Sequence, residues 1–179
     1  MQQPVKSADV DAKLIWRRLE LRDIEALVSI ADTIHPGLPE RTEVFAERVI
    51  LFPAGCLALV DDQSDKLYGY AISLPIAYRQ PPALDVLLGR LPTEADQYYI
   101  HDVAILPEHQ GKGYARCCVE TLLVIADGYA TTSLVSVYGT APFWQRYGFM
   151  RVEPDGELVT KLLNYGEDAV FLERRNQIV

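Results

Sequence analysis

Cysteine, histidine and basic residues are scarce in this sequence. Its 179 residues include three cysteines and three histidines, and 17 lysines and arginines stand against 25 aspartates and glutamates. The formal charge of −8 argues against a nucleic-acid partner, because a protein that binds the phosphate backbone normally carries a basic face. An odd number of cysteines, with Cys117 next to Cys118, argues against a disulfide framework and predicts reduced, packed thiols.

The sequence also lacks a long apolar run. The most apolar uncharged stretch, residues 49–60, contains Pro53 and Gly55 and is shorter than the roughly 18 residues that a membrane span needs. The first residues lack the apolar core of a signal peptide. We therefore expect a cytoplasmic protein with no membrane partner. Length and composition predict a flexible N-terminal tail over residues 1–12 and a single domain over residues 13–179.

Hydrophobic periodicity predicts a mixed α/β domain built on one central sheet. The predicted strands are residues 14–19, 56–60, 67–74, 98–106, 134–137, 150–153 and 169–172. The predicted helices are residues 23–31, 42–51, 114–126 and 142–147. Residues 75–96 hold four prolines and form a long irregular segment, with a short helix expected over residues 84–91. Such a segment inside a compact domain is more often functional than filler.

The stretch from residue 99 to residue 115 carries the strongest chemical signal. A strand there ends in a turn, residues 110–113, that contains two glycines and opens directly into a helix. Such a turn directs free backbone N–H groups to one point near the positive end of the helix dipole, and glycine lets a ligand approach closely. A phosphate or pyrophosphate fits there. The turn is not a Walker loop, because Gly113 follows Lys112, and Arg116 breaks the dinucleotide-binding glycine pattern.

Two motifs carry a resemblance to a known family. The hexapeptide from Gln110 to Ala115 resembles the Gln/Arg-x-x-Gly-x-Gly/Ala signature of the GNAT superfamily of acyl-CoA-dependent N-acetyltransferases. Residues 143–149, Phe-Trp-Gln-Arg-Tyr-Gly-Phe, resemble the second motif of that superfamily, an aromatic pair followed by Gly-Phe. The predicted element order is also similar to the GNAT fold over about residues 12–175. The resemblance implies a mostly antiparallel mixed sheet that splays open between two strands.

The resemblance implies a site for acetyl-CoA as co-substrate, along one strand and the glycine turn. The strand that ends near Ile105 would pair with the pantetheine arm, and the N–H groups of residues 111–116 would hold the pyrophosphate. An N–H group of the strand would polarise the acyl carbonyl. The implied cofactor contacts are Val103, Ala104, Ile105, Gln110, Gly111, Lys112, Gly113, Tyr114, Ala115, Arg116 and Trp144.

His101 is the candidate catalytic base. An acceptor amine with a pKa of about 10.4 is mostly charged at neutral pH, so a group that removes its proton is valuable. A strand period of two places His101 on one face with Tyr99 and Val103, and Asp102 on the opposite face. The region resembles the arylalkylamine (serotonin) N-acetyltransferase branch, in which histidines of this strand are thought to remove the proton. The alternatives are a structural histidine, or a bulge that turns His101 away.

The candidate acid departs from the pattern of the superfamily. Many members have tyrosine as the second residue of the aromatic pair, where it protonates the leaving thiolate, but this sequence has Trp144. An indole N–H is a donor but not a usable acid. Tyr147 is therefore the candidate catalytic acid, with Tyr138 as an alternative, unless the thiolate leaves without one. His35 and His109 have no paired ligand spacing, so no metal site is expected.

The acceptor is the least readable feature of the sequence. Tyr78, Tyr98 and Tyr99 are candidates to line an aromatic or alkylamine pocket, with residues 75–97 and the first two helices as its wall. The leading hypothesis is direct transfer of an acetyl group from acetyl-CoA to a primary amine of a small molecule, in a ternary complex. A protein or peptide acetyltransferase and a non-catalytic CoA-binding module are the alternatives, and a homodimer is left open.

Overall fold

A seven-stranded sheet in the order β1-β2-β3-β4-β5-β7-β6 forms the centre of the protein. The computed structural model describes residues 13–177, and the predicted tail over residues 1–12 lies outside them. The strands are β1 (Leu14–Arg18), β2 (Cys56–Asp61), β3 (Leu67–Ile76), β4 (Gln97–Ile105), β5 (Thr131–Ser136), β6 (Met150–Arg151) and β7 (Val170–Arg175). Only the β4–β5 pair is parallel, which confirms the predicted mixed, mostly antiparallel sheet.

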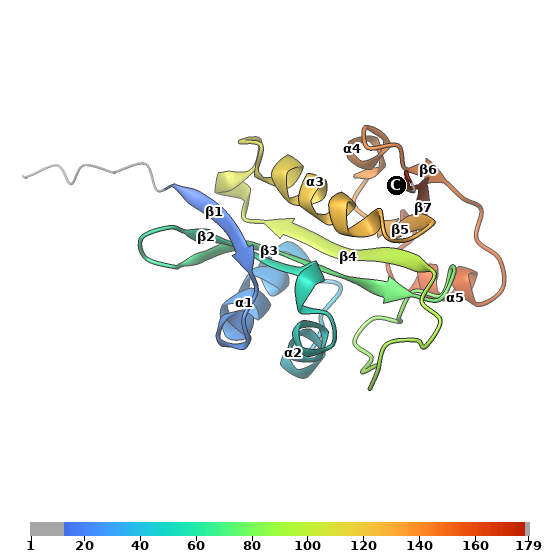
Figure 1. Ribbon diagram of the computed structural model, residues 1–179, viewed down its shortest axis with the longest axis horizontal. Coiled ribbons are helices and arrows are strands. Elements are labelled where there is room, and N and C mark those ends of the chain that lie inside the picture. Colours follow the sequence, from blue (N-terminus) through green and yellow to red (C-terminus); the bar gives the residue numbers. More distant parts are fainter. Residues whose placement is uncertain (1–12, 178–179) are drawn as a thin grey trace, which may run out of the picture.

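Helices cover both faces of this sheet (Figure 1). Helices α1 (Ile24–Ile34) and α2 (Thr42–Leu51) lie on one face, and α3 (Tyr114–Ala126) lies on the other. The shorter helices α4 (Ala141–Gln145) and α5 (Glu157–Leu163) follow β5 and β6. Each long helix buries an apolar stripe at helical spacing, so the sheet separates two cores.

The two central strands β4 and β5 separate along their length. They pair only where residues 97–100 face residues 131–134. Beyond that point residues 102–105 of β4 pair with β3 alone, and the last residues of β5 pair with β7 alone. The predicted splay between two strands is therefore confirmed, and it leaves one edge of β4 unpaired by any strand of residues 13–177.

A β-bulge at the start of this open part decides where its side chains point. Ile72 of β3 pairs with Asp102, but Ser73 pairs with Ile100, so His101 is the extra residue. His101 and Asp102 both bond to groups on the α1–α2 side of the sheet, whereas Val103 packs in the core under α3. The sequence prediction of alternating faces was wrong here, because a bulge breaks the period of two.

Two further elements differ from the sequence prediction. Residues 84–91 form no helix, because prolines flank the segment and Asp85 and Gly89 have positive φ angles of 57° and 71°. Helix α5 was not predicted. The sequence features that could have indicated this helix are the four-residue spacing of its buried residues Leu158 and Leu162 and the glycine, Gly156, that precedes it.

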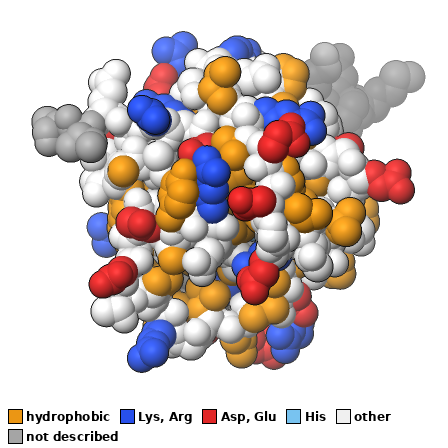
Figure 2. All heavy atoms as spheres, turned by 90° about the vertical axis from the view of Figure 1, so that its right-hand side faces the viewer, with side chains coloured by type: hydrophobic (Ala, Val, Ile, Leu, Met, Phe, Trp, Pro, Cys, Tyr) orange, Lys and Arg blue, Asp and Glu red, His pale blue; other side chains and the backbone are white. Residues whose placement is uncertain are grey.

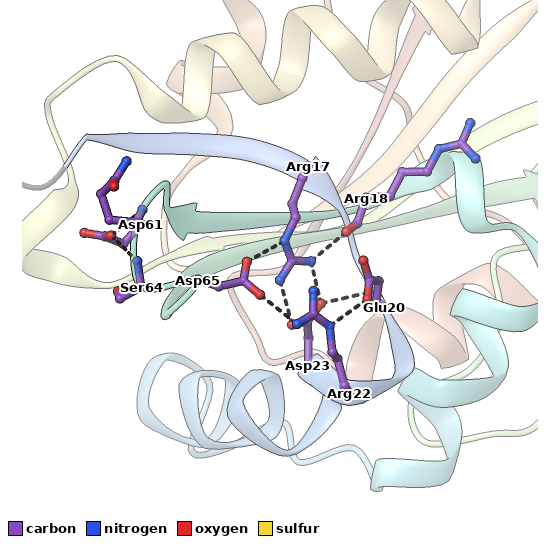
Figure 3. A network of polar contacts seen from close by, with 9 residues as sticks. Arg17, Arg18, Glu20, Arg22, Asp23, Asp61, Ser64 and Asp65 are labelled. Carbon is purple, nitrogen blue, oxygen red and sulfur yellow. Dashed lines mark hydrogen bonds and ion pairs between the residues drawn. The ribbon is translucent and has the colours of Figure 1, made fainter.

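Arg17 ties β1 to the turn between β2 and β3, as Figure 3 shows. Its guanidinium donates to Asp23 at 2.7 and 2.9 Å and to Asp65 at 2.9 Å. Burial would raise the pKa of Asp23, but the hydrogen bonds from Arg17 and from the Glu20 N–H, together with the nearby arginine charges, outweigh it and lower that pKa. The turn that holds Asp65 is therefore fastened to β1 through Arg17.

The three cysteines are unpaired thiols in different surroundings. Cys56 and Cys118 are buried, and burial raises the pKa of Cys56 to about 12. Cys117 is exposed on α3, so the expectation that it is packed was wrong. Among residues 13–177, none of the helices is long and apolar enough to span a membrane.

Candidate active site

A cleft of about 1000 Å³ lies where β4 and β5 separate. It runs between the α1–α2 side of the sheet and the N-terminus of α3. Among the catalytic and cofactor-contact residues expected from the sequence, all except Lys112 line it. The structure therefore brings the glycine turn, the open strand and both candidate catalytic residues into one cavity.

The glycine turn presents unpaired backbone donors to this cleft. Gly111 and Gly113 have φ angles of +72° and +87°, and a Cβ added to either would meet no protein atom within 4 Å. The first helical N–H with a backbone partner is that of Cys117, which donates to the Gly113 carbonyl at 3.2 Å. The N–H groups of residues 111–116 have no acceptor among the described residues. This arrangement fits a bound phosphate or pyrophosphate.

Two side chains brace the turn from within the protein. The Gln110 amide donates from Nε2 to the Ile105 carbonyl at 2.8 Å, which closes the end of β4 onto the turn. The Trp16 indole donates to the Tyr114 carbonyl at 2.9 Å. Both bonds fix the direction in which the free N–H groups point, so Gln110 acts on the turn through its side chain.

The aromatic motif forms the wall next to α3. Trp144 is 8% exposed and packs edge-on against Phe143 and Phe149, with ring centroids 5.1 and 5.6 Å apart. The half-buried Tyr147 lines the same wall, and burial raises its pKa. Trp144 is therefore a packing residue at the position where the family motif often has tyrosine.

His101 forms a buried pair with Glu40, which lies in the loop between α1 and α2. Its Nε2 is 2.6 Å from Glu40 Oε1, and both side chains are 6% exposed. Its Nδ1 is enclosed and has no partner in the described part of the chain. Burial would lower the pKa of His101, but the charge and hydrogen bond of Glu40 outweigh it and raise that pKa above 6.5.

A second imidazole–carboxylate pair lies beside the first. His35, at the end of α1, places Nε2 3.0 Å from Asp102 Oδ1, and the Tyr70 hydroxyl donates to Asp102 Oδ2 at 2.5 Å. Tyr138 stacks on the His35 ring, with the two ring centroids 5.6 Å apart, and lines the cleft. Sequence reasoning missed His35 and Glu40, because each lies more than 60 residues from its partner and no local motif marks it.

The tyrosines expected to line an acceptor pocket do not line the cleft. Tyr98 is buried in the opposite core, where its hydroxyl meets Ser73 Oγ at 2.5 Å. Tyr99 is buried against Leu74, and Tyr78 lies at the surface beside Glu173. The tyrosines that line the cleft are Tyr70, Tyr114, Tyr138, Tyr147 and Tyr165.

Residues 84–89, here called the strap, contribute one residue to the lining of the cleft. Leu84 lines the cavity together with Ile34 and Phe45. Side chains from the α1–α2 region hold the strap through its charged and backbone groups. The bonds run from Arg41 to Asp85 (3.0 Å), from Arg48 to the Val86 carbonyl (2.7 Å), and from the N–H groups of Asp85, Leu88 and Gly89 to Glu40 (3.1 Å) and Glu47 (2.8 and 2.7 Å).

Residues 13–177 contain no group of three or more histidine, cysteine, aspartate or glutamate side chains that could hold a metal ion.

Solved structures share this fold at low sequence identity. The loading GNATL domain of CurA from Lyngbya majuscula matches with a TM-score of 0.72 and 16% identity over 91% of this chain and 98% of its own. The NatC complex bound to Gag peptide and CoA matches with a TM-score of 0.69 and 18% identity over 92% and 99%. N-acetylglutamate synthase from Neisseria gonorrhoeae, complexed with coenzyme A and N-acetyl-glutamate, matches with a TM-score of 0.65 and 20% identity over 93% of this chain and 36% of its own.

These likenesses establish the fold, and the predicted co-substrate acetyl-CoA agrees with them, since two of these structures hold CoA. No curated protein sequence matches the chain. The profile of the acetyltransferase (GNAT) family matches residues 21–149, which include the glycine turn and the whole aromatic motif. The chain therefore belongs to the acetyltransferase (GNAT) family.

Proposed function

We propose that this protein transfers an acetyl group from acetyl-CoA to a primary amine of a small molecule. One observation carries the proposal: a single cleft contains both an anion-binding glycine turn and a buried imidazole–carboxylate pair. The first suits the pyrophosphate of CoA, and the second suits removal of a proton from an amine. An acetyltransferase needs both in one place.

The donor would supply a thioester, and the residues of the chain would hold and orient it. The free N–H groups of residues 111–116 would bind the pyrophosphate, and the open edge of residues 103–105 would pair with the pantetheine arm. A strand N–H group directed at the thioester carbonyl would stabilise negative charge as the amine attacks.

His101 and Glu40 would take up the acceptor's proton as one coupled unit. Deprotonating an alkylammonium at neutral pH costs about 4.6 kcal/mol, which corresponds to 3.4 pKa units. A neutral imidazole beside a carboxylate offsets much of this cost when it accepts the proton. His101 is the histidine that carries the likeness to the arylalkylamine branch, so this role supports an amine acceptor of that general kind.

Two tyrosines are candidates to protonate the leaving thiolate, and Tyr138 has the stronger support. It stacks on His35, whose partner Asp102 is next to His101 in the chain. The charged groups around Tyr147 are Arg146, Glu120 and Arg116, so it lies nearer to the glycine turn. An acid and a base that serve one carbonyl must lie close together, which favours Tyr138.

The strap supports a small-molecule acceptor over a peptide. It is fastened to the α1–α2 region by side chains of Glu40, Arg41, Glu47 and Arg48, and Leu84 contributes to the cleft wall. A partly apolar wall that is fixed in place suits a compact amine better than an extended chain. The likeness to the NatC complex with a bound Gag peptide makes a peptide N-terminus the competing acceptor.

The test is an acceptor panel assayed for CoA release with acetyl-CoA. We expect turnover with small primary amines, including arylalkylamines, and little with peptides that carry a free N-terminus. Turnover on peptides alone would overturn the small-molecule assignment. Tight CoA binding without turnover on either class would show a binding module and overturn the enzymatic proposal.

A further inference from the structure

We propose that Glu40 is the positioning residue of His101, and that one carboxylate thereby fixes both the base and the strap. This inference rests on the proposed function, in which His101 takes the proton of the amine. Glu40 belongs to neither motif of the family resemblance, and it reaches the cleft from the loop between α1 and α2.

Both oxygens of Glu40 are engaged, and this is what makes it a positioning group. Oε1 lies 2.6 Å from His101 Nε2, and Oε2 accepts a hydrogen bond from the Asp85 N–H at 3.1 Å. A carboxylate held at two ends cannot rotate freely, so the imidazole that bonds to it is held as well. The 6% exposure of both side chains keeps water from competing for these bonds.

The Glu40 contact selects one tautomer of neutral His101. A carboxylate accepts but does not donate, so Nε2 carries the proton and the lone pair lies on Nδ1. Nδ1 is enclosed and has no hydrogen-bond partner in the described part of the chain. Without Glu40 either nitrogen could carry the proton, and the ring could turn.

Other titratable and charged groups face His101 from the surrounding elements. Asp102 and Tyr99 lie on the same strand, Arg48 on α2, His35 at the end of α1, and Tyr165 after α5. Asp102 is already bonded to His35 and Tyr70. Arg48 acts in the opposite sense to the carboxylates on the pKa of His101. None of these groups forms a hydrogen bond with the His101 ring among the described residues, whereas Glu40 does.

The Asp85 contact makes the position of the base depend on the strap. Glu40 bonds to the strap backbone on one side and to His101 on the other. Glu47 also accepts strap N–H groups but does not contact His101, and it therefore provides a matched control.

The test compares Glu40→Gln, Glu40→Asp and Glu47→Gln in the full chain, with two readouts. The first is the NMR titration and tautomer of the His101 imidazole in the free protein. The second is the pH dependence of acetyl transfer.

For Glu40→Gln we expect a lower His101 pKa, an acidic limb moved to lower pH and a kcat reduced roughly 10- to 100-fold, with the KM for acetyl-CoA unchanged. Glu40→Asp should restore part of the pKa, and Glu47→Gln should leave it unchanged.

An unchanged titration and tautomer in Glu40→Gln would overturn the positioning role. An equal shift in Glu47→Gln would overturn it too, because a loosened strap would then be the cause. A shifted titration with an unmoved rate profile would confirm that Glu40 holds the imidazole but overturn His101 as the base. If Glu40→Gln does not fold, Glu40→Asp serves as the test. The shorter aspartate side chain lengthens the contact with His101, so both the His101 titration and the pH dependence of acetyl transfer should still shift.

Discussion

Two imidazole–carboxylate pairs line the cleft. Glu40–His101 lies deeper, with 6% exposure of each side chain, and His35–Asp102 is more open at 15% and 16%. Tyr138 stacks on the His35 ring with the ring centroids 5.6 Å apart, whereas Tyr99 lies at a tilt to the His101 ring with the centroids 6.0 Å apart. The difference suits a division of labour in which the deeper pair handles the proton of the amine and the outer pair positions Tyr138.

The acid assignment makes a prediction about single residues. Tyr138→Phe should lower kcat roughly 10-fold or more if this hydroxyl protonates the thiolate, because acid catalysis contributes about 10²–10⁴-fold when it is needed. Tyr147→Phe is the matched control and should change kcat little. Both effects are read in steady-state assays with the best amine of the panel. A larger loss in Tyr147→Phe would restore that residue as the acid.

The sequence predicts a candidate site residue where that residue sits inside a local motif. His101 and the residues of the glycine turn could be proposed because strand, turn and helix are contiguous in the chain. Glu40 and His35 could not, since tertiary folding alone brings them to β4. The face assignment of Asp102 failed because a bulge at His101 depends on the register between β3 and β4, which no local pattern encodes.

The main functional element is the junction of β4, the glycine turn and α3. Positive φ angles at Gly111 and Gly113 turn successive N–H groups toward the cleft, and the brace from Gln110 holds them there. The open edge of β4 continues this surface, because β5 has already diverged. Strand, turn and helix thus form one continuous surface of backbone donors and acceptors.

A glycine substitution tests this element. Gly113→Val places a side chain in the open space where the ligand is expected and forces an L-residue to a φ of +87°. We expect CoA affinity to fall at least 10-fold in calorimetry. Gly156→Val is the control, because it carries a positive φ of +53° and an equally open Cβ position but does not line the cleft. Equal CoA affinity in both variants would contradict the placement of the pyrophosphate.

Elements with strong periodicity were predictable from the sequence, and short or exposed ones were not. The three long helices and the central strands match the apolar pattern closely. The strap failed as a predicted helix because side chains of the α1–α2 region, rather than its own backbone bonds, hold it. Helix α5 was missed because Val159 and Leu163 are exposed and blur its amphipathic pattern.

The net charge of the whole molecule affects how charged ligands approach the cleft. A formal charge of −8 opposes the approach of CoA and favours that of a cationic amine. In Figure 2, acidic, basic and hydrophobic side chains are interspersed over one end of the molecule. Binding of an anion must therefore rest on short-range backbone donors at the glycine turn, where screening and the global field matter less.

The central claim is that His101 removes the proton of an amine acceptor in this cleft. The pH dependence of kcat/KM for the best amine, in the wild type and in His101→Gln, tests it most directly. The wild-type rate should rise with pH through a pKa above 6.5, since the imidazole must be neutral to accept a proton. His101→Gln should lose this limb and fall roughly 10²–10⁴-fold while still binding CoA. An unchanged acidic limb in His101→Gln would contradict the account.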